Sequence, residues 1–171
     1  MNAPAALMIT DPNQPPRQLR MIERIVQTNR FGTRYPWTFF VHDGLLTIMS
    51  RVDKVDSETG ASRTLFGQRE FPIGVAQWIV DQLTPFKREG IFPGSIFVLE
   101  TEIGGESIGL IRGVEIGGPG IPGFDLTNRS RKDHKMPRFN QEFPMPDPFL
   151  WEQGLFELWE RIADEHRRGL Y

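Results

Sequence analysis

Arginine and aromatic side chains alternate over residues 30–39, where Arg30 and Arg34 stand beside Tyr35 and Trp37. Cationic side chains neutralise phosphates, and flat rings stack on unpaired bases with about 1–3 kcal/mol per base. This mixture therefore indicates a site for single-stranded nucleic acid. An alternative remains open, because strand alternation puts Trp37 on the same face as Phe39, and in this alternative that face belongs to the core.

A second basic run covers residues 128–135 and follows a glycine-rich loop. In a mobile loop these cations would contact phosphates, whereas in the alternative they belong to a solvated surface loop. The two basic segments are more persuasive together than either is alone. The candidate nucleic-acid-binding residues are Arg30, Arg34, Tyr35, Trp37, Arg129, Arg131, Lys132 and Lys135.

The sequence contains no strong motif for catalysis, metal binding or cofactor binding. It has no cysteine, which excludes disulfides, zinc–thiolate sites and thiol nucleophiles. The glycine-rich residues 117–123 lack the Lys-Ser/Thr ending of a phosphate loop. The three histidines are far apart, and Glu100 and Glu102 fit a solvated strand face better than a cation site. We therefore expect a protein that is not an enzyme, with no catalytic residue, no metal and no cofactor.

Composition and charge fit a globular chain with one basic side. With 171 residues, 39% hydrophobic and 25% charged, it is long enough for one domain or two small halves with a shared core. The net charge is −2, but residues 17–69 carry +4 and residues 124–138 carry +3. No apolar run approaches the roughly 20 residues of a membrane span, and residues 1–8 lack the charged start of a secretory signal. These features predict a cytoplasmic protein that does not bind a membrane.

Strand signals dominate the first half of the chain, and a helical stripe of apolar residues follows them. Residues 17–29 suit either a strand or a short helix. The stripe begins at Val75, and Thr84-Pro85 is expected to end the helix. The predicted strands are Trp37–Val41, Leu45–Val55 and Ser62–Glu70, and an Asp-Gly turn joins the first two.

The second half opens with a predicted hairpin and ends in a predicted helix. Residues 117–140 show no convincing further strands. The last helix is expected to begin with Asp147 as its cap and to end at Gly169. The hairpin comprises Ile96–Ile103 and Ser107–Ile116, joined at Gly104-Gly105.

A short phrase occurs twice, as Gln68–Ile73 and as Asn140–Met145, with its Phe-Pro pairs 72 residues apart. Each copy ends a region of strand signals and precedes a helix that carries tryptophan. The repeat predicts an α+β fold of two antiparallel β-meanders, each followed by an α-helix. The expected organisation is a flexible N-terminal arm over residues 1–16, a first unit over 17–90 and a second unit over 91–171, with one shared core.

This order of strands, helix, strands and helix resembles the PUR and Whirly family of single-strand nucleic-acid-binding proteins. The resemblance covers roughly residues 17–168 and rests on the junctions at Glu70-Phe71-Pro72 and Glu142-Phe143-Pro144. It implies curved four-stranded sheets that bind nucleic acid, with the helices behind them or in a dimer interface. The second half departs from the pattern, because residues 117–140 lack clear strands.

The leading functional hypothesis is a non-enzymatic protein that binds single-stranded DNA or RNA through basic and aromatic strand residues. The alternative is an adaptor subunit of a larger assembly, which contacts its partners through the N-terminal arm and the last helix. A third class, a small hydrolase or nuclease that uses acidic residues with His42 or His134, has the least support. Homo-oligomer formation is a further expectation.

Overall fold

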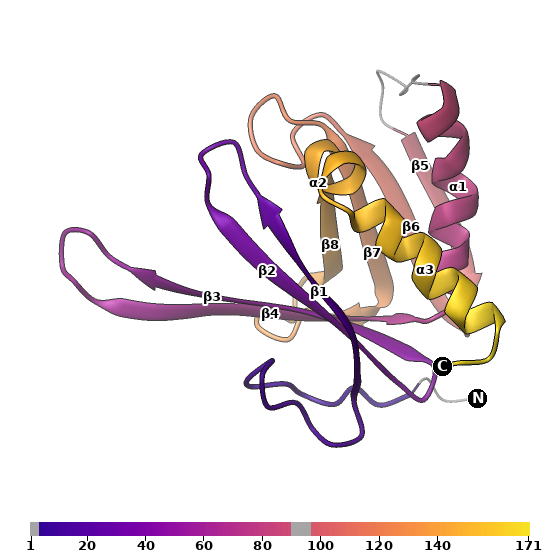
Figure 1. Ribbon diagram of the computed structural model, residues 1–171, viewed down its shortest axis with the longest axis horizontal. Coiled ribbons are helices and arrows are strands. Elements are labelled where there is room, and N and C mark those ends of the chain that lie inside the picture. Colours follow the sequence, from indigo (N-terminus) through magenta and orange to yellow (C-terminus); the bar gives the residue numbers. More distant parts are fainter. Residues whose placement is uncertain (1–3, 90–96) are drawn as a thin grey trace.

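The computed structural model describes residues 4–89 and 97–171, and it contains two four-stranded antiparallel sheets (Figure 1). In each sheet the strands pair in chain order, and a helix follows the last strand, which confirms the predicted α+β fold. Sheet A comprises β1 (Arg20–Thr28), β2 (Arg34–His42), β3 (Leu45–Val55) and β4 (Ser62–Pro72), followed by α1 (Val75–Glu89). Sheet B comprises β5 (Phe97–Ile103), β6 (Glu106–Gly113), β7 (Gly123–Lys132) and β8 (Asn140–Pro146), followed by α2 (Asp147–Glu152) and α3 (Leu155–Arg167).

The first meander matches the sequence prediction closely. Residues 17–29, which suited a strand or a helix, supply β1. The Asp-Gly turn between β2 and β3 has positive φ at both positions, 47° at Asp43 and 72° at Gly44. This left-handed geometry matches the twist of the two flanking strands. The predicted strand start at Ile96 lies outside the described residues.

The second meander is complete, which corrects the expectation that residues 117–140 hold no further strands. β7 and β8 pair over Gly123–Asn128 and Gln141–Pro146. The sequence did not indicate β8, because this strand contains Pro144 and Pro146, which lack backbone N–H groups. Both prolines are tolerated because β8 is the edge strand of sheet B, so one side of its backbone needs no partner strand.

The predicted end of the first helix and the predicted single last helix both need correction. α1 continues through Pro85 to Glu89, so Thr84-Pro85 does not end it. Its buried residues Val75, Ile79 and Leu83 hold it against the core, which outweighs one lost backbone hydrogen bond. The last helix is divided into α2 and α3 by Gly154, whose φ is 89°.

Asp147 does not cap the last helix as expected, because no side-chain capping hydrogen bond forms there. Its carboxylate instead pairs with both terminal nitrogens of Arg112 on β6, at 2.5 and 2.7 Å. Gly169 does follow the helix in a left-handed conformation, with φ 72°, as the sequence predicts.

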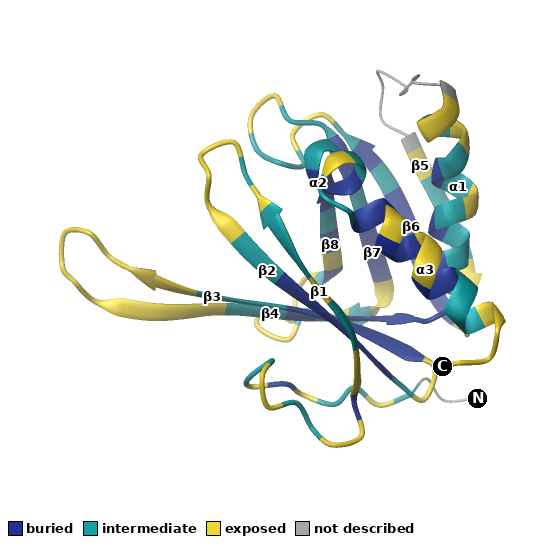
Figure 2. Ribbon diagram, viewed as in Figure 1, coloured by how far each residue is buried: buried dark blue, intermediate teal, exposed yellow. Residues whose placement is uncertain are grey.

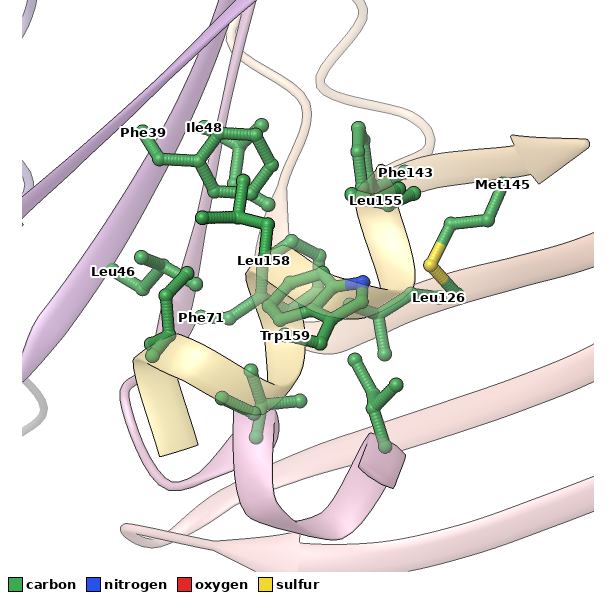
Figure 3. Packing of buried hydrophobic residues seen from close by; sticks show 14 of the residues in the cluster. Phe39, Leu46, Ile48, Phe71, Leu126, Phe143, Met145, Leu155, Leu158 and Trp159 are labelled. Atoms are coloured by element: carbon green, nitrogen blue, oxygen red, sulfur yellow. The ribbon is translucent and has the colours of Figure 1, made fainter. Parts of the chain in front are cut away.

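One continuous hydrophobic core joins the two units, with contributions from both sheets and all three helices. Trp159 of α3 lies at its centre, fully buried, with Phe39 and Phe143 edge-on at 5.8 and 6.3 Å between ring centroids (Figure 3). Helices α1 and α3 pack side by side over sheet B (Figure 1).

The outer part of sheet A extends beyond this core. Its strands are buried where they pass the helices and exposed toward the tips of the β1–β2 and β3–β4 hairpins (Figure 2). A stretch of the sheet's core-facing side therefore lies past the last core residue, and no helix of the described residues covers it.

The N-terminal arm, residues 4–16, contains no helix, as its prolines predict, but it is not devoid of buried residues. Ile9 is fully buried in a second apolar cluster with Leu19, Phe40 and Met49, on the face of sheet A opposite the main core. Ile9 is the single buried residue among residues 4–16, and its packing docks the arm onto sheet A. An isolated isoleucine between polar and proline residues gave no periodic signal for it.

We predict that Ile9→Ala destabilises the protein by about 2–5 kcal/mol, the usual cost of truncating a buried isoleucine. Met8→Ala is the matched control, since Met8 is 48% exposed, and it should cost less than about 0.5 kcal/mol. Urea melts of both variants measure the difference. Equal stability of the two variants would show that the arm is not docked in solution.

Candidate functional site

The two copies of the repeated phrase meet each other, one at the end of β4 and one at the start of β8. The Gln141 side chain accepts a hydrogen bond from the Glu70 backbone N–H at 2.7 Å. Reciprocally, the Arg69 side chain donates from Nε to the Glu142 backbone carbonyl. Arg69 and Gln141 occupy the same position in the two phrases. The repeat therefore creates a junction between β4 and β8 with two related sides, one at Gln141 and one at Arg69.

The first side is closed by a buried polar cluster around Glu70, whose side chain is fully buried. Its carboxylate accepts hydrogen bonds from Gln141 at 2.5 Å and from Gln68 at 2.6 Å. His134 Nε2 lies 2.8 and 2.9 Å from its two oxygens. A buried carboxylate is tolerated only when it is satisfied in this way, so these partners are needed for the fold.

The cluster extends across sheet B through a second buried carboxylate, that of Glu106. Asn128 donates to the Glu70 carbonyl at 2.9 Å and to Glu106 at 2.6 Å. Arg131 binds Glu106 through two nitrogens, at 2.8 and 2.7 Å. The guanidinium of Arg131 is thus engaged in a structural ion pair and is only 13% exposed.

The N-terminal arm covers this polar cluster. Gln68 accepts from the Ile9 N–H at 2.8 Å and donates to the Leu7 carbonyl at 2.9 Å. Arg131 donates to the Pro4 carbonyl at 2.8 Å. Because these hydrogen bonds join the arm to β4 and β7, the closed polar cluster around Glu70 has a structural role.

The basic residues expected to form an interface are therefore divided among different environments. Arg131 is held by Glu106 in a mostly buried ion pair, an environment that does not favour a phosphate contact. Arg129 pairs with Glu100 at 2.5 Å, and Lys132 donates to Asn140 at 2.8 Å. Arg30 bonds the Pro119 carbonyl at 2.9 Å, beside a different loop, and Arg34 is exposed at the start of β2.

The second side of the junction is open and forms a groove of about 430 Å³. Its floor is the uncovered part of sheet A, where Trp37, Ser50 and Gly67 lie opposite one another on β2, β3 and β4. Pro144 of β8 and Lys135 of the β7–β8 loop, residues 133–139, form the other wall. The full lining is Gln27, Tyr35, Trp37, Ser50, Val52, Leu65, Phe66, Gly67, Arg69, Lys135 and Pro144.

Three of the predicted binding residues meet in this groove, namely Tyr35, Trp37 and Lys135. Lys135 Nζ lies 4.0 Å from the centre of the Phe66 ring, which is a cation–π contact. A second, smaller pocket of about 170 Å³ continues past Phe66 and Lys135 along the β7–β8 loop. The groove therefore combines aromatic surface with cations, the chemistry that the sequence placed in two separate segments.

The Trp37 ring belongs mainly to the core and is 6% exposed, which agrees with the alternative that strand alternation left open. It packs edge-on against Phe143 at 5.0 Å, and its Nε1 donates to Gln27 Oε1 at 3.0 Å. Only its margin reaches the groove. Tyr35, two residues along the same face, is half-buried and supplies the more accessible ring.

Arg69 is the most unusual group in the groove. Its guanidinium lies over the Trp37 ring at 5.3 Å, and its Nη1 has no hydrogen-bond partner among the described residues. Burial lowers the pKa of Arg69, while the carboxylates of Asp133, Glu142 and Asp125 act in the opposite direction. A buried guanidinium nitrogen without an acceptor costs stability, and such groups are rare in folded proteins.

Sequence reasoning missed Gln27, Phe66 and Arg69 in the groove, and His134 in the polar cluster. Arg69 stood in the repeated phrase, so its place in the repeat was a usable signal. The others offered none, because their partners are distant in sequence. His134 and Glu70, for example, are 64 residues apart.

Within residues 4–89 and 97–171, no group of three or more His, Asp or Glu side chains is placed to hold a metal ion. In the same part of the chain, no helix has the length and apolar character needed to cross a bilayer. Comparison with known families, curated proteins and solved structures finds no match.

We predict that Arg131→Met destabilises the protein by about 3–5 kcal/mol, because it leaves the Glu106 carboxylate buried without its cation. Arg129→Met serves as the control for an exposed ion pair, and it should cost about 0–1 kcal/mol. Denaturant melts distinguish the two. A loss below about 1 kcal/mol for Arg131→Met would contradict the structural role of Arg131.

A pH-dependent effect is expected at Asp125, whose pKa is raised to about 6 by burial and by the neighbouring Glu142 carboxylate. Because the folded state holds this proton more tightly than the unfolded state, the stability contributed by protonation is lost as pH rises through about 6. Asp125→Asn should therefore gain stability relative to wild type at pH 7.5 but not at pH 4. Since Asp125 is partly solvated, we expect a gain of about 1 kcal/mol. The same stability difference at both pH values would contradict this.

Proposed function

We propose that this protein binds single-stranded DNA or RNA and that an unpaired base enters the groove beside Tyr35 and Phe66. The observation that carries this proposal is the meeting of aromatic and cationic side chains from β2, β4 and the β7–β8 loop in one open groove of about 430 Å³. Stacking on aromatic side chains needs an unpaired base, so a single strand fits this arrangement better than a duplex.

Phosphate contacts would come from cations at the margin of the groove. Lys135 lines the groove itself and is exposed, and Arg34 is the exposed neighbour of Tyr35. Arg131 is omitted from this set because Glu106 already holds it. The proposed interface therefore has few phosphate contacts, so its affinity should depend on salt less steeply than that of a strongly basic protein.

The adaptor alternative has less physical support. It requires the arm and the last helix to offer apolar surface to a partner. Instead, Ile9 of the arm is fully buried within the chain, and so are Leu155, Trp159 and Ile162 of α3. These side chains would have to leave their present packing before a partner could contact them.

Fluorescence anisotropy with labelled oligonucleotides of about 15 nucleotides tests the proposal. Single-stranded DNA or RNA should bind more tightly than duplex DNA. Tyr35→Ala should weaken binding by about 1–3 kcal/mol without changing the salt slope, since stacking releases no counterion. Lys135→Ala should reduce the slope of log affinity against log salt by about 0.7.

Arg129→Ala is the matched control, because Arg129 lies in the same basic run but outside the groove lining. It should leave affinity nearly unchanged. The absence of binding to any oligonucleotide at low salt would refute the proposed function. Binding that is insensitive to Tyr35→Ala and Lys135→Ala, in folded variants, would refute the groove as the site.

A further inference from the structure

We propose that the strand bound in the groove continues past Gln27 into a neighbouring cavity, where Arg30 and Phe31 bind a further nucleotide. This inference rests on the proposed function and adds a second nucleotide site to it. The cavity, which we call the hairpin cavity, has a volume of about 260 Å³ and lies between the β1–β2 hairpin, the β6–β7 loop (residues 114–122) and the start of α2. Its lining includes Arg30, Ile121, Pro146 and Pro148.

The groove and the hairpin cavity adjoin along two strands. Gln27 of β1 lines both of them. On β8, Pro144 lines the groove and Pro146 lines the hairpin cavity. Residues at alternate positions share one face of a strand, and these two lie about 7 Å apart along it. A nucleotide has about twice as many backbone bonds as an amino-acid residue, so an extended nucleic-acid strand covers a similar distance with one nucleotide.

A cation lies over a phenylalanine ring at both places. In the groove this pair is Lys135 and Phe66, with Nζ 4.0 Å from the ring centre. At the hairpin cavity it is Arg30 and Phe31, with Cζ 4.8 Å from the ring centre. Phe31 is 77% exposed, so it offers a base a stacking surface beside a cation that can contact the phosphate. The hairpin cavity therefore repeats the combination of groups on which the proposed function rests.

Arg30 and Phe31 belong to a turn that the protein holds in place. The Asn29 side chain accepts a hydrogen bond from the Phe31 backbone N–H at 2.9 Å. Arg30 Nη1 donates to the Pro119 carbonyl at 2.9 Å, which joins the tip of the β1–β2 hairpin to the β6–β7 loop beside it (Figure 1). A guanidinium carries further N–H donors, so Arg30 can keep this bond and contact a phosphate at the same time.

Arg30 also differs from the basic residues of β7 in its partners. Arg129 and Arg131 are paired with the carboxylates of Glu100 and Glu106. Arg30 is exposed, and among the described residues no carboxylate pairs with it. A phosphate that binds Arg30 therefore displaces no carboxylate, and its binding releases a counterion.

The dependence of affinity on oligonucleotide length tests the inference. Wild-type affinity for oligothymidylates of about 2 to 12 nucleotides should rise until both sites are filled. Ile121→Trp fills the hairpin cavity without changing its charge, and Phe31→Ala removes the stacking surface. Both variants should reach their highest affinity at a shorter length than the wild type. Phe31→Ala should weaken binding of the longest strand about five- to hundredfold, as expected for one lost stacking contact.

Salt dependence separates the cation from the ring. Arg30→Ala should reduce the slope of log affinity against log salt by about 0.7, whereas Phe31→Ala should leave the slope unchanged. Phe139→Ala is the matched control for the ring, because Arg138 lies 4.7 Å from its centre and the pair borders neither cavity.

Val114→Trp is the matched control for Ile121→Trp, because Val114 is in the same loop but is 67% exposed and outside the lining. Phe139→Ala and Val114→Trp should both keep the affinity and the length dependence of the wild type.

Each other outcome overturns a defined claim. If folded Phe31→Ala, Arg30→Ala and Ile121→Trp all behave as the wild type while Tyr35→Ala weakens binding, the hairpin cavity is not a site and the proposed function stands. An equal loss of affinity at every length in Phe31→Ala and Ile121→Trp would also overturn the second site, because it would indicate a damaged groove. The absence of binding at any length in low salt would refute the proposed function itself.

Discussion

The fold depends on a carboxylate that has no contact with water. Glu70 is fully buried at the end of β4, and its side chain and backbone are bonded by Gln68, Gln141, Asn128 and His134. Because an unsatisfied charge there would cost several kcal/mol, these groups have to be in place together. They come from both sheets and the β7–β8 loop, and Gln68 in turn binds the N-terminal arm. One satisfied charge therefore fixes the position of sheet A relative to sheet B and of the arm relative to both.

The repeated phrase gives this junction two sides. One side is closed and hydrogen-bonded within the protein, and the other side is an open groove. On one side the protein supplies every acceptor and donor, and the arm covers the result. On the other side Arg69, which lines a groove of about 430 Å³, has a terminal nitrogen without a hydrogen-bond partner among the described residues. Lys135, which lines that groove, follows His134, which Glu70 holds. The closed side thus positions part of the open side, so the structural cluster and the proposed binding site share one loop.

Local sequence signals sufficed for the fold class, the first meander and the doubled layout, since these depend on alternation, Asp-Gly turns and a repeated phrase. They failed at β8 and α1, where edge position and core packing outweighed the usual effect of Pro144 and Pro85. Basic charge located the β7–β8 region but could not separate Arg131, which pairs with a buried carboxylate, from Lys135, which lines the groove. That distinction depends on Glu106, 25 residues from Arg131, and no local pattern encodes it.

The central claim is that a single strand occupies the open side of the junction. Titration of the ¹⁵N-labelled protein with oligo-deoxyuridine, followed by NMR, tests it most directly. The account predicts that the largest shifts fall on Tyr35, Gly67, Lys135 and the Nε–H of Arg69, while Arg129 and Lys132 change little. Shifts confined to residues 129–132, with the groove signals unmoved, would contradict it.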